Sequence, residues 1–186
     1  MKVILISGKA QHGKDTVANV LAKELRDAGY GVLITHYADL LKYICRTFFG
    51  WDGEKDDAGR TLLQHVGTDI IRKQDPDFWV CFITRILTLF PNIWDYVIIP
   101  DARFPNEVTL IESVFDTVLI RVYRPDFDQK LSESQQNHAS ETSLDDFVPD
   151  YYIKNDGTLR DLKNKVIALL RDTSLFRQTQ IQEMQQ

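Results

Sequence analysis

The sequence predicts an α/β domain in which a parallel sheet of five strands lies between two layers of helices. Three observations lead to this three-layer fold class. The strand candidates are mostly continuous apolar runs, which suit parallel strands buried on both faces. Helical patterns separate these runs, so β and α elements alternate along the chain. A glycine-rich loop joins the first apolar run directly to the first helical pattern.

Five apolar segments are the expected strands. In chain order they are MKVILIS (1–7), YGVLITHY (30–37), DYVIIPD (95–101), DTVLIRVY (116–123) and DYYIKND (150–156). The first helix follows the glycine loop, with apolar residues at helical spacing until Gly29, a suitable C-cap. The last helix begins at Thr158, where Asp161 three residues later makes a variant of the capping box.

A long insert, about 38–91, separates the second and third strands. Its apolar spacing predicts three helices, at 38–49, 60–73 and 76–90, with a charged turn between the first two. A polar stretch with little apolar content, about 124–148, follows the fourth strand. A loop of this length in a compact domain is functional or disordered, and we expect a lid that excludes water from a reaction.

Length and composition favour one domain that binds small molecules. With 186 residues and 44% hydrophobic content, the chain suffices for one core, here 1–172, and the glutamine-rich tail 173–186 is expected to fray. A net charge of −5 argues against a nucleic-acid or anionic-membrane partner, and no apolar segment predicts export or a membrane span. Cys45 and Cys81 lie in apolar helical stretches, so we expect buried free thiols and a reducing, cytoplasmic location.

The stretch SGKAQHGKDTVANV nearly matches the phosphate-binding motif G-x-x-x-x-G-K-[ST], with Gly8, Gly13 and Lys14 in register. Between a strand and a helix, such a loop directs backbone N–H groups and the positive end of the helix at an anion. This context predicts that the loop binds nucleotide phosphates. One residue departs from the motif: Asp15 stands where a hydroxyl binds Mg²⁺, and the hydroxyl moves to Thr16.

The carboxylate of Asp15 has two interpretations. It stabilises the helix start through the macrodipole, or it acts on a Mg²⁺ ion that lies between it and the phosphates. In the second interpretation Thr16 contacts phosphate, and Asp101, at the end of the third strand, orders the water shell of the metal. Arg103 then offers a guanidinium to phosphate oxygens at the same edge of the sheet. A capping Asp101 beside a solvated Arg103 is the alternative.

The second helix of the insert carries a polar stripe opposite its apolar face. The stripe consists of Arg60, Gln64, Thr68 and Arg72. Two arginines and an amide suit a phosphate and a base edge, although polar stripes are commonly solvated faces. Asp39 and Lys42 follow the second strand, near the expected cleft, where a capping Asp is the simpler interpretation.

The lid and the last turn contain further candidates. Arg124, at the base of the lid, is suited to stabilise transferred charge, while His138 is a general base, a ligand or a surface residue, with Glu141 close by in sequence. Asn155 and Gly157 follow the last strand, beside the expected phosphate loop. Their backbone groups suit the edge of an adenine ring, and a plain tight turn explains them equally well.

The motifs GKAQHGKDT, YADLLK, GRTLLQHVGTD, DFW, PDARFPNEV, YRP, HASE and KNDGT follow one another over nearly the whole chain. In this order the sequence resembles the deoxynucleoside monophosphate kinases of the bacteriophage type, with the GKD-T loop as the most specific feature. The resemblance implies a P-loop kinase fold with a lid and a helical nucleotide-binding insert. It also implies transfer of the ATP γ-phosphate to a deoxynucleoside 5′-monophosphate (dNMP), with Mg²⁺.

The expected site residues combine the motifs with this resemblance. The expected ATP-binding residues are Gly8, His12, Gly13, Lys14, Asp15, Thr16, Asn155 and Gly157. The expected dNMP-binding residues are Asp39, Lys42, Arg60, Gln64, Thr68, Arg72, Arg103, His138 and Glu141. The expected catalytic residues are Lys14, Arg103 and Arg124, and the expected metal-side residues are Asp15, Thr16 and Asp101.

Alternatives remain at this stage. Pro100 stands where the family usually has a small residue, which leaves the placement of Asp101 open. Animal phosphomevalonate kinases have a similar loop, and a nucleotide-sensing switch that binds ATP without an acceptor is a rival from another class. The arginines of the insert and lid argue against the switch, since ATP binding alone needs none of them. The resemblance also implies the host cytoplasm, and the oligomeric state stays open, a homodimer included.

Overall fold

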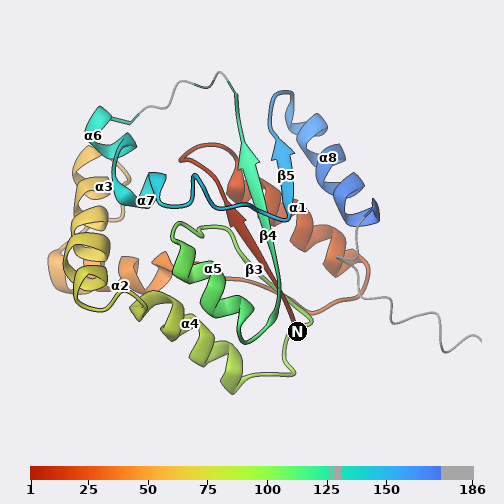
Figure 1. Cartoon of the computed structure of the whole chain (residues 1–186), viewed down its shortest axis with the longest axis horizontal. Helices are drawn as coiled ribbons and strands as arrows, with labels where there is room; N and C mark the ends of the chain where they lie inside the picture. Colours follow the sequence, from red (N-terminus) through yellow and green to blue (C-terminus); the bar gives the residue numbers. More distant parts are fainter. Residues whose placement is uncertain (126, 128–130, 173–186) are drawn as a thin grey trace, which may run out of the picture.

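A computed structural model of the chain describes residues 1–125, 127 and 131–172. Its centre is a sheet of five parallel strands in the order β2-β3-β1-β4-β5, which confirms the predicted sheet (Figure 1). The strands are β1 (Lys2–Ser7), β2 (Val32–Ile34), β3 (Tyr96–Ile99), β4 (Asp116–Tyr123) and β5 (Tyr151–Lys154). The predicted tail lies outside the described residues.

Helices cover both faces of the sheet, as Figure 1 shows. On one face pack α1 (Lys14–Asp27) and α8 (Leu159–Asp172), and on the other pack α4 (Phe78–Leu89) and α5 (Pro105–Glu112). The order of layers is therefore helix, sheet, helix, as predicted. In this doubly wound topology the carboxyl ends of the strands meet at one edge, where ligands bind in such folds.

The two faces of β1 show why its sequence is a continuous apolar run. Ile4 and Ile6 pack with α1 and α8, while Val3 and Leu5 pack with α4 and α5, and all four side chains are fully buried. Neighbouring residues of a strand point to opposite faces, so a strand covered on both sides needs apolar residues at every position.

The insert departs from the predicted three helices. Its first helix, α2 (Ala38–Phe49), is as expected, but the second is divided into α3 (Asp57–Gln64) and a π-helix, η1 (His65–Arg72). Within η1, Gly67 packs so closely on α2 that a Cβ atom there would lie 2.6 Å from Leu41 Cδ2. π-Helical turns are rare and occur mostly at functional sites, and apolar periodicity does not report them.

Three smaller expectations are corrected. The second strand is only three residues long and half-buried, because it is the edge of the sheet, whereas the apolar run of 30–37 suggested a longer strand. Cys45 is a buried free thiol, as expected, but Cys81 is exposed, because it lies on the outer side of α4. The third helix of the insert also begins at Phe78, later than predicted.

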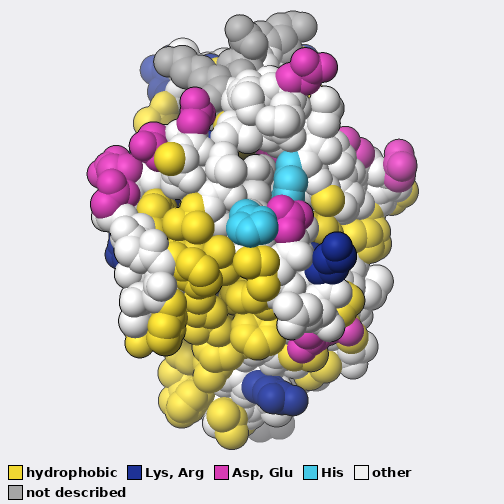
Figure 2. Space-filling view, turned by 90° about the vertical axis from the view of Figure 1, so that its left-hand side faces the viewer, with side chains coloured by type: hydrophobic (Ala, Val, Ile, Leu, Met, Phe, Trp, Pro, Cys, Tyr) yellow, Lys and Arg dark blue, Asp and Glu magenta, His cyan; other side chains and the backbone are white. Residues whose placement is uncertain are grey.

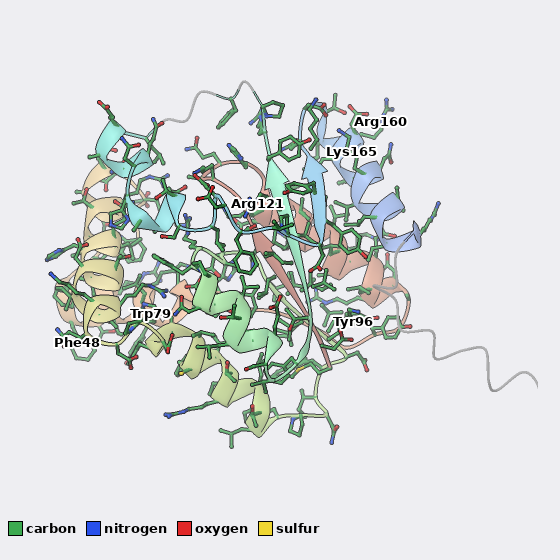
Figure 3. All side chains as sticks on the ribbon, viewed as in Figure 1. Phe48, Trp79, Tyr96, Arg121, Arg160 and Lys165 are labelled. Carbon is green, nitrogen blue, oxygen red and sulfur yellow. The ribbon has the colours of Figure 1, made fainter. Side chains whose placement is uncertain are left out.

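The lid region contains two short helices, α6 (Glu133–Gln136) and α7 (Ala139–Thr142), and residues 126 and 128–130 of it lie outside the described residues. Its apolar content matters more than the sequence suggested, because Leu144 is buried in the core on the side of the sheet that α4 and α5 cover, and Phe147 packs against the same cluster. Arg121 of β4, marked in Figure 3, donates hydrogen bonds to the carbonyl oxygens of both residues. The end of the lid is therefore attached to the core.

The outer side of the insert is apolar. Figure 2 shows hydrophobic side chains gathered on the side of the molecule that carries Phe48, which Figure 3 marks. On α2, Tyr43, Phe48 and Phe49 are exposed.

Within the described ranges, no helix is both long and apolar enough to cross a membrane.

Candidate active site

The glycine loop between β1 and α1 has the backbone conformation that its sequence predicts. Gly8 and Gly13 have φ angles of +140° and +99°, in the region where side chains are strained. At Gly8 a Cβ atom would lie 2.1 Å from the carbonyl oxygen of Val122 in β4, so both conformation and space require glycine there. The conformation of the loop therefore depends on residues with positive φ angles. Gln11, with a φ of 63°, is a further one.

Lys14 lies inside this loop. Its ammonium donates to the carbonyl oxygens of Gly8 at 2.7 Å and of Lys9 at 2.9 Å, and the residue is only 9% exposed. Burial, followed by the positive charge of Arg103, lowers the pKa of Lys14 to about 8. The group is poised to gain stabilisation from any anion that enters the loop.

A cavity of about 390 Å³ lies between the loop, the insert, the end of β3 and the lid. It brings together residues from five separate sequence motifs. The predicted site residues that line it are Lys14, Asp15, Lys42, Arg60, Gln64, Thr68, Arg72, Asp101, Arg103 and Glu141. The polar stripe of the insert thus faces the cavity and is no ordinary solvated face.

Asp101 serves two purposes at the cavity wall. Its carboxylate oxygens accept hydrogen bonds at 3.0 Å from the backbone N–H groups of Tyr37 and Ala38, at the start of α2. The capping interpretation is therefore correct in part. Asp101 nevertheless lines the cavity, and each of its oxygens retains a second lone pair.

Asp15 has a partner that the sequence analysis did not identify. Its carboxylate lies 3.5 Å from His36 Nε2, and His36 Nδ1 lies 3.3 Å from Asp39, which in turn pairs with Lys42 at 2.9 Å. The hydrogen bond between Asp15 and His36 lowers the pKa of Asp15 and raises the pKa of His36. His36 follows the carboxyl end of β2, a position that could have marked it as a candidate.

Arg72 is held by Glu107, a second residue that the sequence analysis passed over. The two side chains form an ion pair of 2.5 Å, and the Arg72 guanidinium lies 3.9 Å from the centre of the Phe104 ring. Glu107 is only 2% exposed, and burial raises the pKa of its carboxyl group. A buried acid in the first turn of a helix after PDARF was the available signal.

The lid contacts the glycine loop directly. Arg103 donates to the carbonyl oxygen of Ser140 at 2.8 Å and to the carboxylate of Glu141. Glu141 also accepts from the backbone N–H of Ala10 at 2.9 Å, and Lys9 donates to the carbonyl oxygen of Glu141 at 2.6 Å. These contacts hold the lid against the loop, with the Glu141 carboxylate on a backbone N–H group of the loop.

Other predicted residues lie outside this cavity. The Arg124 guanidinium stacks over Phe127 at 4.1 Å, and its backbone N–H donates to His12 Nδ1 at 3.3 Å. Burial and the charge of Lys14 lower the pKa of His12. Asn155 donates to the carbonyl oxygen of His12 at 3.0 Å and so supports the loop from below.

His138, Thr16 and Gly157 also do not line the cavity of about 390 Å³. His138 Nδ1 accepts the backbone N–H of Ser140 at 3.2 Å and caps α7, and its Nε2 lies 3.8 Å from Asp69 of η1. It therefore connects the lid to the insert. Gly157 lies in the turn before α8, beside the side chain of Asp161.

The fold and the glycine loop together define a P-loop kinase. The chain is similar to the APS kinase CysC of Mycobacterium tuberculosis in complex with AMPPNP and APS, with a TM-score of 0.51, 15% identity, and coverage of 91% of this chain and 97% of that one. It is also similar to the dephospho-CoA kinase of Campylobacter jejuni, with a TM-score of 0.51, 15% identity, and coverage of 92% and 97%. At such identities these likenesses show the fold alone.

Residues 37–166 match the family model "Deoxynucleotide monophosphate kinase", and the chain belongs to that family. This confirms the resemblance identified in the sequence. The match begins after the glycine loop, so the loop is evidence of its own for a phosphate-binding site.

Two curated relatives carry the same description. The chain is 35% identical to the deoxynucleotide monophosphate kinase of Enterobacteria phage T4 over 114 residues, which are 60% of this chain and 45% of that protein. It is 31% identical to the enzyme of Escherichia phage RB69 over 114 residues, 60% of this chain and 44% of that protein. The chain thus spans about half the length of the curated relatives it matches.

Proposed function

We propose that the protein transfers the γ-phosphoryl group of ATP to a deoxynucleoside 5′-monophosphate, giving the diphosphate. The observation that carries this proposal is the cavity that has a P-loop on one wall and the arginines of an insert on the other. A protein that only binds ATP needs no second wall of guanidinium groups. Membership of the family supports the same substrate class.

The glycine loop is the proposed ATP side. Its backbone N–H groups and the start of α1 would hold the β- and γ-phosphates. The ammonium of Lys14, released from the carbonyl oxygens of Gly8 and Lys9, would neutralise charge that develops on the transferred group. His12 and Asn155 maintain the loop, and Arg124 is a proposed contact outside the cavity.

The acidic residues at the cavity fit a hydrated Mg²⁺ ion. Within the described part of the chain, no cluster of three or more acidic, histidine or cysteine residues forms a metal cage. Mg²⁺ is commonly bound by one or two carboxylates, several waters and the substrate phosphates, and Asp15 and Asp101 suit that donor set. When bound, the ion supplies charge neutralisation on the phosphates. Thr16 is the proposed hydroxyl at the phosphates.

The insert is the proposed dNMP side. Arg72 and Arg103 would contact the acceptor phosphate, since guanidinium groups bind phosphate oxygens in pairs. Arg60, Gln64 and Thr68 line the remaining wall and would face the nucleoside. The lid would exclude water, which otherwise competes with the acceptor for the phosphoryl group.

A coupled assay of ADP release tests the proposal. The protein and Mg²⁺-ATP are incubated with each deoxy- and ribonucleoside monophosphate, with phosphomevalonate, and without acceptor. We expect ADP only with deoxynucleoside monophosphates, and the diphosphate product is verified by chromatography. ADP release with phosphomevalonate alone would assign the runner-up activity, and ATP binding without transfer to any acceptor would leave a nucleotide switch.

The remaining expectations form part of this proposal. The partners are small nucleotides, the location is the cytoplasm, that of the host if the protein is of phage origin, and nucleic acid and membranes are not partners. The oligomeric state stays open, a homodimer included.

A further inference from the structure

We infer that Glu107 is a positioning residue that sets the two acceptor-side arginines, Arg72 and Arg103, in place before a ligand binds. The inference rests on the proposed function for the identity of the ligand. It assigns a task to a residue that lies at the base of the cavity and that phosphate transfer itself does not use.

One carboxylate connects two parts of the cavity wall. Oε1 of Glu107 accepts from the Arg72 guanidinium at 2.5 Å. Oε2 accepts from the backbone N–H groups of Arg103 at 2.6 Å and Phe104 at 3.0 Å. The turn that carries Arg103 and the side chain of Arg72 are therefore fixed by the same group, although Arg72 comes from η1 and Arg103 follows β3.

The surroundings leave this cluster little freedom. The Phe104 ring lies under the Arg72 guanidinium, and the Tyr37 hydroxyl donates to the carbonyl oxygen of Glu107 at 3.1 Å. Arg72 also donates from Nη1 to the carbonyl oxygen of Pro76 at 3.0 Å. Buried charges are retained where they are paired, and here the partners of Glu107 are groups that face the cavity.

A simpler role for Glu107 is a helix cap. The bond from Phe104 N–H to Oε2 is the ordinary contact of a glutamate in the first turn of α5. A cap explains Oε2 and leaves Oε1 unexplained, because Oε1 is directed at Arg72. The contact of Oε1 with Arg72 therefore distinguishes a positioning residue from a helix cap.

Ordering the arginines in advance favours ligand binding for two reasons. Free arginine side chains lose rotamer entropy when they are fixed, and a site that is already ordered does not incur this loss on binding. Arg72 and Arg103 each bring a guanidinium to the cavity wall, the first paired with Glu107 and the second with Glu141 of the lid. A dianionic phosphate is the ligand chemistry that this arrangement fits.

The variant Glu107→Gln tests the positioning role, because glutamine keeps an oxygen for the backbone N–H groups and loses the charge at Arg72. The full chain is titrated by calorimetry with inorganic phosphate, with dGMP and dTMP, and with ATP. We expect at least tenfold weaker binding of phosphate and monophosphate, while ATP affinity changes by less than twofold. Glu112→Gln, on the exposed side of α5, is the matched control and should change neither affinity.

A double-mutant cycle separates positioning from folding. In an Arg72→Met background, Glu107→Gln should weaken the monophosphate by less than threefold, because the group it acts through is absent. Unchanged phosphate and monophosphate affinities in Glu107→Gln, with only a lower melting temperature, would make Glu107 a helix cap and overturn the inference.

The outcomes for inference and function are distinguishable. Phosphate binding that depends on Glu107, without binding of any dNMP, would leave the positioning role and remove the proposed substrate. Transfer to dNMPs that Glu107→Gln leaves unchanged would support the proposed function and overturn the positioning role. A protein that binds neither phosphate nor monophosphate would contradict the proposed function and the positioning role.

If Glu107→Gln does not fold, the positioning role of Glu107 is tested on the unmutated protein. Side-chain NMR of arginine-labelled protein should show separate, exchange-protected Nη resonances for Arg72, assigned by their loss in Arg72→Lys. A single averaged signal would mean that Arg72 rotates freely, and the inference would be wrong.

Discussion

The two walls of the cavity are built in different ways. The loop wall comes from one contiguous segment, residues 8–16, which lines the cavity with Ala10, Gln11, Lys14 and Asp15. The insert wall presents side chains from α3, η1, the turn after β3 and the lid, and its Arg72 and Arg103 guanidinium groups are held by Glu107 and Glu141 respectively, each far from its partner in the sequence. Local backbone conformation thus determines one wall, and contacts between distant residues determine the other.

This difference predicts where each wall is vulnerable. The loop wall should fail when a glycine gains a side chain, whereas most of its other side chains can change. The insert wall should lose ligand affinity stepwise as individual guanidinium or carboxylate groups are removed, because its conformation does not depend on a single backbone position.

The largest effect is expected at Gly8. In Gly8→Ala the methyl group would lie 2.1 Å from the Val122 carbonyl oxygen at a φ of +140°, so we expect a loss of roughly 3 kcal/mol or more of unfolding free energy. Chemical denaturation measures it. Gly29→Ala is the matched control, because Gly29 also has a positive φ but open space around it, and should lose only about 1 kcal/mol. Equal losses would contradict the steric explanation.

Lys14→Met should remove the charge from the loop wall without unfolding the protein. We expect turnover to fall on the order of 10² to 10³-fold, as for the loss of one group that stabilises transition-state charge. Stability should hold or rise, because a buried ammonium is unfavourable. Lys23→Met, at an exposed position of α1, should leave the rate unchanged. Near-normal turnover of Lys14→Met would refute the role of the loop.

Arg103→Ala should weaken the acceptor side selectively. Losing a charge-assisted contact with phosphate amounts to roughly 1.5 to 3 kcal/mol, so KM for the monophosphate should rise about 10- to 100-fold. The affinity for ATP, measured by calorimetry, should change far less. Arg85→Ala, on the exposed side of α4, is the control for general charge loss. A loss confined to ATP affinity would mean that Arg103 lies on the ATP side of the cavity and that the two walls have been assigned to the wrong substrates.

The pKa of Lys14, lowered to about 8, predicts a pH effect on the loop wall. Below that pH the ammonium already carries its proton, and ATP affinity should be flat. Above it, ATP binding has to take up a proton, so Kd should rise by up to about tenfold per pH unit. In this range the unfolded chain binds the proton more tightly than the folded protein does, so unfolding free energy should rise with pH. Calorimetry in buffers of different ionisation enthalpy measures the uptake, which Lys14→Met should abolish.

The smallest effect is expected for Asp15→Asn. The Mg²⁺ concentration for half-maximal rate should rise a few-fold, because one carboxylate beside the phosphates is lost. Binding of ATP without metal should stay equal or improve, since a repulsive charge is gone. Asp27→Asn, at the exposed end of α1, is the control. An unchanged Mg²⁺ midpoint with a lower melting temperature would leave Asp15 as a helix-start residue that pairs with His36.

The lid shows where sequence reasoning reached its limit. Its low apolar content gave no indication of an attachment to the core, yet Leu144 and Phe147 pack into the core and Arg121 donates hydrogen bonds to their carbonyl oxygens. Only two apolar side chains decide this, too few to stand out in composition. The same segment reaches the cavity, where Glu141 contacts Arg103, and its role as a lid stays a prediction.

The sequence by itself determined the five strands, their parallel sheet and the glycine loop of this family member. Continuous apolar runs leave a strand no face for water, and glycines at positive φ specify a turn without help from distant residues. Tertiary structure alone decided that Arg72 pairs with Glu107, that His36 faces Asp15, and that the second insert helix widens into a π-helix. The physical reason is that a buried charge depends on its partner, and that partner lies across the fold, where spacing along the chain does not indicate it.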